Sequence, residues 1–442
     1  MAIAIARMEG RRALGPDRAL NVSRLKTDLL LGLSLRGLGA LAGFALAWMI
    51  AQMFGARIVG LYQIAFTTAT FLAAMALIGQ DVVVVREIAP LLKDDRLAEA
   101  SSRFRGSRRM VLGIGVVLAL ITAAAAMPLA QYGLDDAAAA GFIIVLAPAI
   151  VLLVQLRTHA ALLRSLGKVM LSQTLEGVSY TTIAVIGLGA LWLFGAEPAP
   201  LAAPALLLAG LVLSAAAGWR AVARALAAMP SDLPPVRPDM RSGLRVASGP
   251  ILTQAGNWLA LLAIAGLMSA AEGGIFRIAV QVCMLMQLIN GSFATMAGPH
   301  LARAANAGDT RQLRRTILTA GGIGIALSAP LGLLALLLPA WIMGLFGPEF
   351  VSGAAALQWL TIGQLINVAA GPVGVALIMQ RREALVMTVE VCANLTLIGL
   401  TVLLLPHWGL AGAGFATFAA SLVRNGANWL FCWFGAPRQP SS

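Results

Sequence analysis

Long apolar runs alternate along the chain with short polar connections. A hydrocarbon core of about 30 Å requires roughly 20 apolar residues per helix, and about twelve runs come close to that length. They lie at 29–53, 58–80, 110–131, 138–156, 170–193, 200–219, 246–270, 273–298, 316–345, 353–379, 384–405 and 409–432. The pattern predicts an all-α polytopic membrane protein with about twelve transmembrane helices.

Composition supports the same class of protein. The chain is 59% hydrophobic and 12% charged, and its mean hydropathy is +0.85. That leaves too little polar surface to cover a soluble globule. In a soluble protein the net charge of +13 would suggest nucleic acid. Basic residues interleaved with aromatic ones are lacking, so we expect no nucleic-acid partner.

The basic residues gather in every second connection. These connections are the N-terminal tail at 1–28 and the segments 86–109, 157–168, 220–245, 303–315 and 381–382. The connections between them are nearly free of positive charge. Because Lys and Arg are retained on the cytoplasmic side, we expect both termini to be cytoplasmic. Helices rich in alanine and glycine suggest the inner, or cytoplasmic, membrane of a bacterium.

One hexapeptide occurs twice. Residues 60–65, GLYQIA, return 214 positions later as 274–279, GIFRIA. Three further pairs keep the same offset: Asp95 with Asp309, Lys168 with Arg382, and Glu176 with Glu390. The chain is therefore predicted to contain two copies of one unit. With six spans in each copy, the bundles are parallel and related by a pseudo-two-fold axis along the membrane normal.

The repeat and the charge pattern predict the domain boundaries. We expect a basic cytoplasmic tail at 1–28, a six-helix bundle at 29–219, a cytoplasmic linker at 220–245, a second six-helix bundle at 246–432 and a cytoplasmic tail at 433–442. In transporters built in this way, substrate sits between the bundles and is reached alternately from either side.

Three arginines are candidate substrate-binding residues. Arg36 lies inside the first run on a stripe of glycines, where it either snorkels to the headgroups or borders a wet cavity. Arg57 and Arg277 lie near the predicted outer side, against the overall charge pattern. Arg57 is either a solvated loop charge or part of the cavity. Arg277 occupies the position that Gln63 has in the first copy. An anionic ligand between the halves would favour such a positive charge in one copy only.

Three acids are candidate ion-coupling residues. Glu176 and Glu390 lie inside the fifth and eleventh runs. They either bond to neighbouring helices or bind a proton or sodium ion during transport. Asp81 closes the second run, and we expect it to form an interfacial charge pair with Arg86, with proton coupling as the weaker alternative.

Three amides are further candidates for substrate binding, and the sequence shows no metal-binding pattern. Gln254, Asn257 and Asn290 either tie helices together or offer hydrogen bonds to sugar hydroxyls. The three cysteines fall in apolar runs, and the three histidines are too far apart in sequence to suggest a metal cluster. We expect no cofactor and no metal.

Several short motifs occur in the order typical of one transporter family. They are Phe54-Gly55-Ala56, Gly60-Leu61-Tyr62, Gly79-Gln80-Asp81, Arg86-Glu87-Ile88-Ala89, Leu166-Gly167-Lys168 and the stretch from Gly409 to Thr417. Each is degenerate alone, but their order and spacing over nearly the whole chain resemble polysaccharide-exporting flippases. These belong to the multidrug/oligosaccharidyl-lipid/polysaccharide exporter superfamily.

The resemblance implies a function and its partners. It implies movement of a polyprenyl-diphosphate-linked oligosaccharide to the periplasmic leaflet through a cationic cavity. Membrane lipids, a proton or sodium gradient and a polysaccharide polymerase are the implied partners. Arg36, Arg57 and Arg277 suit the cavity, although no family motif specifies them. The chain departs from the fourteen-helix lipid II flippases, because no apolar run follows Phe434.

Three other functions compete with this one. A multidrug or cation antiporter of the same superfamily would share the topology but needs acids deep in one half. A sugar transporter of the major facilitator type would carry a Gly-Asp-Arg motif that residues 81–95 lack. A membrane enzyme of polysaccharide assembly would need a large extramembrane loop with catalytic groups. No phosphate-binding GxxxxGK[ST] loop occurs, so we expect no ATP hydrolysis.

Overall fold

The computed structural model describes residues 22–195, 198–230, 232–307 and 309–434, and every regular element in these ranges is a helix. Inside the helices, the side chains of residues 22–31, 33, 36, 288–296, 299, 300 and 306 lie outside the description. The described chain divides into two compact units. Unit 1 comprises residues 22–49, 65–132 and 137–251, and unit 2 comprises residues 50–64, 133–136 and 252–434.

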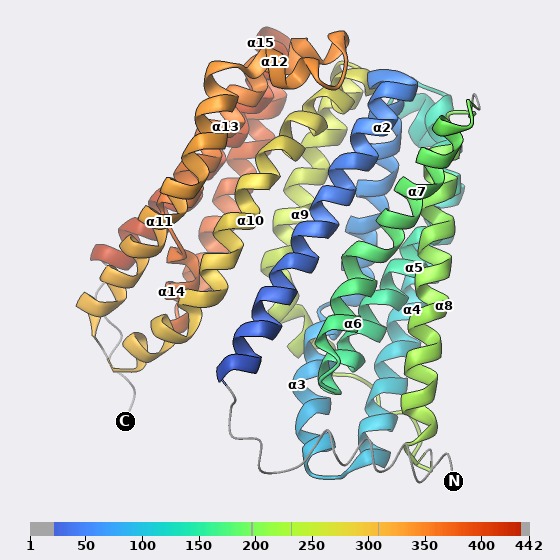
Figure 1. Ribbon diagram of the computed structural model, residues 1–442, viewed down its shortest axis with the longest axis vertical. Helices are drawn as coiled ribbons and strands as arrows, with labels where there is room; N and C mark the ends of the chain where they lie inside the picture. The colour runs from blue at the N-terminus through green and yellow to red at the C-terminus, as the bar shows by residue number, and fades with distance from the viewer. Residues whose placement is uncertain (1–21, 196–197, 231, 308, 435–442) are drawn as a thin grey trace. The chain divides into compact units, whose positions relative to one another are not determined.

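Unit 1 is organised around the buried helix α5 (Ala138–Ser165). Its partners are α3 (Gln80–Lys93), α4 (Leu97–Pro128), α6 (Val169–Gln173) and α8 (Ala202–Ala227) (Figure 1). The turn η2 (Thr174–Val178) joins α6 to α7 (Ser179–Leu193), which packs on α8. Enclosure by several helices explains why α5 is apolar on all its faces from Ala138 to Val154. The unit also contains parts of α2 (Val22–Leu77), η1 (Leu129–Gly133) and α9 (Met240–Leu267).

Unit 2 is organised around α13 (Ala354–Ala369). It packs against α10 (Ala270–Asn306), α11 (Thr310–Leu337) and α15 (Glu383–Phe434) (Figure 1). The short elements α12 (Pro339–Gly344) and η3 (Pro348–Gly353) precede α13, and α14 (Val373–Met379) follows it. Leu313, Ile317, Val373 and Leu377 form the centre of a buried apolar cluster between α11 and α14.

The two units repeat one packing order. Moving α5 forward by the repeat offset gives residues 352–379, which are the residues of α13 and α14 with the end of η3. The same shift places α4 on α11, and each of these helices packs against the central helix of its unit. This correspondence supports the internal repeat predicted from the hexapeptides.

The chain is a multi-pass helical membrane protein, as predicted. Within the described residues, eight helices are long and apolar enough to cross a membrane, or up to nine if the bent pair of Pro348–Ala369 and Val373–Met379 is one span. The predicted count of twelve differs partly because α2 and α15 each contain two predicted runs. Non-helical backbone at Gly55 and Gly409 marks where the two runs meet.

The two copies of the repeated hexapeptide meet inside unit 2. A Cβ placed on Gly60 would lie 1.7 Å from the backbone oxygen of Ala270, and one placed on Gly274 would lie 2.3 Å from that of Ala56. Ala56 and Ala270 are themselves one repeat offset apart, so the contact is reciprocal, as in an interface between identical subunits. Only glycine permits backbones to approach this closely.

The polar linker is held on unit 1. It is shorter than the predicted segment 220–245, because α8 continues to Ala227 and α9 begins at Met240. Ser102 and Arg105 of α4 donate hydrogen bonds to the backbone oxygens of Pro234 and Leu233. At Gly106 the linker passes so closely that a Cβ would lie 1.7 Å from the oxygen of Val236.

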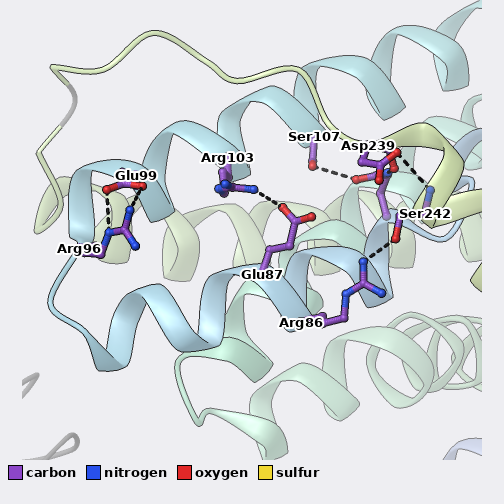
Figure 2. A network of polar contacts seen from close by, with 9 residues as sticks. Arg86, Glu87, Arg96, Glu99, Arg103, Ser107, Asp239 and Ser242 are labelled. Carbon is purple, nitrogen blue, oxygen red and sulfur yellow. Dashed lines mark hydrogen bonds and ion pairs between the residues drawn. The ribbon is translucent and has the colours of Figure 1, made fainter. Parts of the chain in front are cut away.

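A polar network continues this attachment to the start of α9 (Figure 2). Asp239 accepts hydrogen bonds from the backbone N–H groups of Arg241 and Ser242. Figure 2 shows the contact with Ser242 and the hydrogen bond that Arg86 of α3 donates to the Ser242 hydroxyl. Beside it, Arg103 of α4 and Glu87 of α3 form an ion pair at 2.7 Å (Figure 2). The linker and the first turns of α9 are thereby tied to α3 and α4.

The glycine contact predicts a stability effect. Gly274→Ala should lower the free energy of unfolding by about 1–3 kcal/mol, because the new methyl group forces backbone to move. The measurement is the thermal unfolding midpoint in detergent. Gly322→Ala is the control, since a Cβ there meets no atom within 4 Å. Equal midpoints for the two variants would contradict the prediction.

Candidate functional site

Arg277 and Gln63 lie face to face in unit 2. The Nε of Arg277 donates to the Oε1 of Gln63 at 3.3 Å, and the two positions are 214 residues apart. Arg277 is half-buried on α10, while Gln63 is 5% exposed. Equivalent positions of the repeat therefore meet beside the glycine contact, and only one of them carries a charge. The sequence predicted this asymmetry but not the contact.

Arg57 forms an ion pair at the surface. Its Nε and Nη2 donate to the two carboxylate oxygens of Asp136 at 2.8 and 2.7 Å. The Arg57 side chain is 57% exposed. Exposed pairs of this kind contribute at most about 1 kcal/mol. The geometry agrees with the solvated loop charge that was one of the two interpretations of Arg57.

Arg36 lies on α2, but its side chain lies outside the described residues. The glycine stripe around it is described at two positions. Gly32 faces the side chain of Gln173, and Gly39 faces the backbone oxygen of Gly177, at 3.2 and 3.1 Å from an added Cβ. At these two positions the stripe packs against α6 and η2.

The first of the two repeat-related glutamates forms an ion pair within unit 1. Glu176 lies in the π-helical turn η2, and its Oε2 accepts a hydrogen bond from Nη1 of Arg164 at 2.6 Å. Both side chains are about one quarter exposed, at 26% and 28%. Arg164 ends α5, so the pair joins the fifth predicted span to the central helix of the unit.

The second glutamate is bound by more donors. Glu390 of α15 accepts two hydrogen bonds from Arg424, Nε to Oε2 at 2.7 Å and Nη2 to Oε1 at 2.9 Å. Thr253 of α9 donates to Oε1 at 2.6 Å, and the Asn394 amide donates to the same oxygen at 3.2 Å. A single carboxylate thus accepts hydrogen bonds from α9 and from the parts of α15 before and after Gly409.

The two glutamates are equivalent in the repeat, but their arginines are not. One repeat offset before Arg424 stands Gly210, and one offset after Arg164 stands Ile378. Sequence reasoning overlooked Arg424, although an arginine within the last apolar run was visible. A proton or cation that binds either glutamate must displace a guanidinium. Ion coupling by these residues stays a prediction.

Asp81 does not form the predicted pair with Arg86 among the described contacts. Its Oδ1 accepts a hydrogen bond from the backbone N–H of Val82, in the first turn of α3. Arg86 binds Ser242 instead. Five residues turn a helix by about 140°, so these two side chains point away from each other, unlike pairs spaced three or four apart.

The side chains of two of the three amides predicted to bind sugar are described. Gln254 is half-buried and Asn257 is exposed on α9, while the side chain of Asn290 lies outside the described residues. A different pair is formed, in which Gln287 of α10 donates to Gln364 of α13 at 3.3 Å. That contact ties two helices together, which was the alternative interpretation of the amides.

No group of three His, Cys, Asp or Glu side chains suited to a metal ion occurs in the part of the chain that the structure describes. Cys283 and Cys432 are buried, whereas Cys392 is exposed. His159 is fully buried beside Trp219, at 5.8 Å between ring centroids. The guanidinium of Arg108 lies 4.3 Å above the same tryptophan.

Comparison with known proteins gives both a family and a fold. The family model described as "Polysaccharide biosynthesis protein" matches residues 28–305. No curated protein matches the sequence significantly.

Several solved structures share the fold. An inward-facing multidrug resistance MATE family transporter of the MOP superfamily has a TM-score of 0.74 and 15% identity, over 92% of this chain and 97% of that one. The lipid II flippase MurJ in an inward closed conformation has a TM-score of 0.72 and 13% identity, over 91% and 87%. A MOP superfamily transporter from Pyrococcus furiosus Vc1 (DSM3638) has a TM-score of 0.63 and 16% identity, over 96% and 97%.

The ion pair of unit 2 predicts non-additive effects on stability. Arg424→Gln should lower the free energy of unfolding by about 3 kcal/mol, because it leaves a buried carboxylate without its cation. Glu390→Gln in the same chain should recover part of that loss. Thermal or denaturant unfolding of the two single variants and the double variant measures the coupling. Strict additivity would show that the pair contributes nothing.

Proposed function

Because the chain belongs to the polysaccharide biosynthesis protein family, we propose that it is a flippase for a polyprenyl-diphosphate-linked oligosaccharide in polysaccharide export. The family match carries this proposal. The fold shared with transporters, one of them a lipid II flippase, supports it. The membrane is the bacterial inner membrane, with both termini on the cytoplasmic side, in keeping with the basic connections.

Physical chemistry favours a transporter with cationic groups for this task. A diphosphate bearing sugars cannot cross hydrocarbon unaided, because each unsatisfied polar group costs several kcal/mol there. Arginine suits diphosphate because its guanidinium forms paired hydrogen bonds with phosphate oxygens. The prenyl tail remains in lipid while the headgroup crosses.

Alternating access between the two repeats supplies the movement. The moving bodies are the predicted bundles at 29–219 and 246–432, joined by the linker segment 220–245. Arg277 is the principal headgroup ligand, because it is half-buried and has only a neutral amide as its described hydrogen-bond partner. Arg36, Gln254, Asn257 and Asn290 are further candidates. Arg57 is a weaker one, since Asp136 already neutralises it. An ion gradient or the membrane potential drives any uphill transport.

An ion-coupled multidrug antiporter is the second candidate function. Several of the solved structures that share the fold are multidrug transporters. Such a function requires an acid that is free to bind a cation. Both intramembrane glutamates are instead paired with arginine, which favours the flippase.

Translocation in proteoliposomes tests the proposal. A fluorescent short-chain polyprenyl-diphosphate oligosaccharide should change leaflet with the native chain, and Arg277→Gln should slow it at least about tenfold by removing a charged hydrogen-bond donor. The Gln variant makes this position match Gln63 of the other repeat. Arg315→Gln, an exposed arginine of α11, is the control and should keep the native rate.

Two outcomes would oppose the flippase. Native protein that leaves the headgroup in its original leaflet, but takes up a cationic dye under a proton or sodium gradient, would identify the antiporter. Equal translocation by the native chain and Arg277→Gln would keep the flippase and remove Arg277 from the site.

A further inference from the structure

The Glu390 site of unit 2 has the donor set of an anion-binding site. Arg424, Thr253 and Asn394 supply four hydrogen bonds to one carboxylate. The donors come from α9 and from the parts of α15 before and after the break at Gly409. A planar guanidinium fork beside a hydroxyl and an amide is also a suitable arrangement for phosphate oxygens.

Burial in this site is unequal. The Glu390 side chain is 11% exposed, whereas that of Arg424 is 29% exposed. An incoming anion can therefore reach the guanidinium before it reaches the carboxylate. Asn394 is 4% exposed, and its Oδ1 has no hydrogen-bond partner among the described residues. That oxygen is directed at Gly256, where an added Cβ would lie 1.6 Å away. It is an acceptor packed against backbone, so only the donors of this site can bind an anion.

The site is specific to the second repeat. Glu176, the equivalent glutamate, has a single described hydrogen bond from Arg164, and the position equivalent to Arg424 is Gly210. Arg277 shows the same bias, because its equivalent is Gln63. The first repeat has an unmatched arginine of its own, because the position equivalent to Arg164 is Ile378. What distinguishes unit 2 is the larger donor set around its glutamate.

We propose that Arg424 is an anion-binding residue for the diphosphate of the substrate, and that Glu390 is a built-in competitor that occupies the Arg424 fork when no substrate is bound. This inference rests on the proposed flippase function. A carboxylate carries one negative charge, so a diphosphate with a higher charge displaces it. The singly charged phosphodiesters of bulk lipids do not. Glu390 thus sets a charge threshold that distinguishes the carrier lipid from the surrounding membrane.

Binding to the purified full chain in detergent tests this role. The probes are farnesyl diphosphate, inorganic diphosphate and a phosphatidylglycerol, which separate the prenyl diphosphate, the free anion and the bulk-lipid headgroup. Glu390→Gln should tighten binding of both diphosphates by about tenfold, and should create measurable binding of the phosphodiester lipid. Adding Arg424→Gln to Glu390→Gln should abolish these gains.

Two further variants protect the test against misfolding and general charge effects. Glu390→Asp keeps the charge but withdraws it by one methylene, so it should tighten diphosphate binding by a smaller factor. Glu87→Gln removes a carboxylate that is also paired with an arginine at 2.7 Å, but outside unit 2, and should leave every affinity unchanged.

Unchanged or weaker diphosphate binding in both Glu390 variants, with native unfolding midpoints, would overturn the inference. Native translocation of the glycan lipid would then still support the flippase. Tighter diphosphate binding by Glu390→Gln without any translocation by the native chain would instead uphold the anion site and reject the proposed substrate.

Discussion

The close approach of Gly60 and Gly274 is the constraint on which the second unit depends. Two helix starts meet there backbone to backbone, each against the oxygen of an alanine at the equivalent position. No side chain fits in this contact, so the helices are held at a separation that brings Gln63 and Arg277 into hydrogen-bonding distance one turn further on. A steric requirement of the backbone thereby fixes where the charge of Arg277 lies.

The charges within the apolar helices follow a second constraint, which is the cost of leaving an ion unpaired away from water. Glu176, Glu390 and Arg57 each have an oppositely charged partner. Arg277 has a neutral amide instead. An arginine that is half-buried and hydrogen-bonded to a neutral group is the one most readily recruited by an anion, because binding does not first require the loss of an ion pair.

Helices and their apolar runs could be predicted from the sequence, because in a membrane each span must satisfy its own backbone and remain apolar for roughly 20 residues. The repeat could be predicted as well, since Gly60 and Gly274 are indispensable to the contact they form. The partners of individual charges could not. Asp81 and Arg86 are close in sequence but lie on different faces of α3, whereas Glu390 is paired across 34 residues with Arg424. An arginine near the predicted cytoplasmic end of a helix resembles an ordinary snorkelling residue, so only the fold identifies its partner.

The repeat also makes the differences between its copies interpretable. Where both copies keep a residue type, as with Gly60 and Gly274 or Glu176 and Glu390, the shared architecture is sufficient to explain it. Where one copy alone gains a cation, as at Arg277 and Arg424, the architecture does not require the charge, because the other copy folds with Gln63 and Gly210 in those positions. Such a charge costs desolvation energy in an apolar helix. A ligand of opposite charge that meets the two halves unequally provides a reason for that cost at these two positions of the second copy.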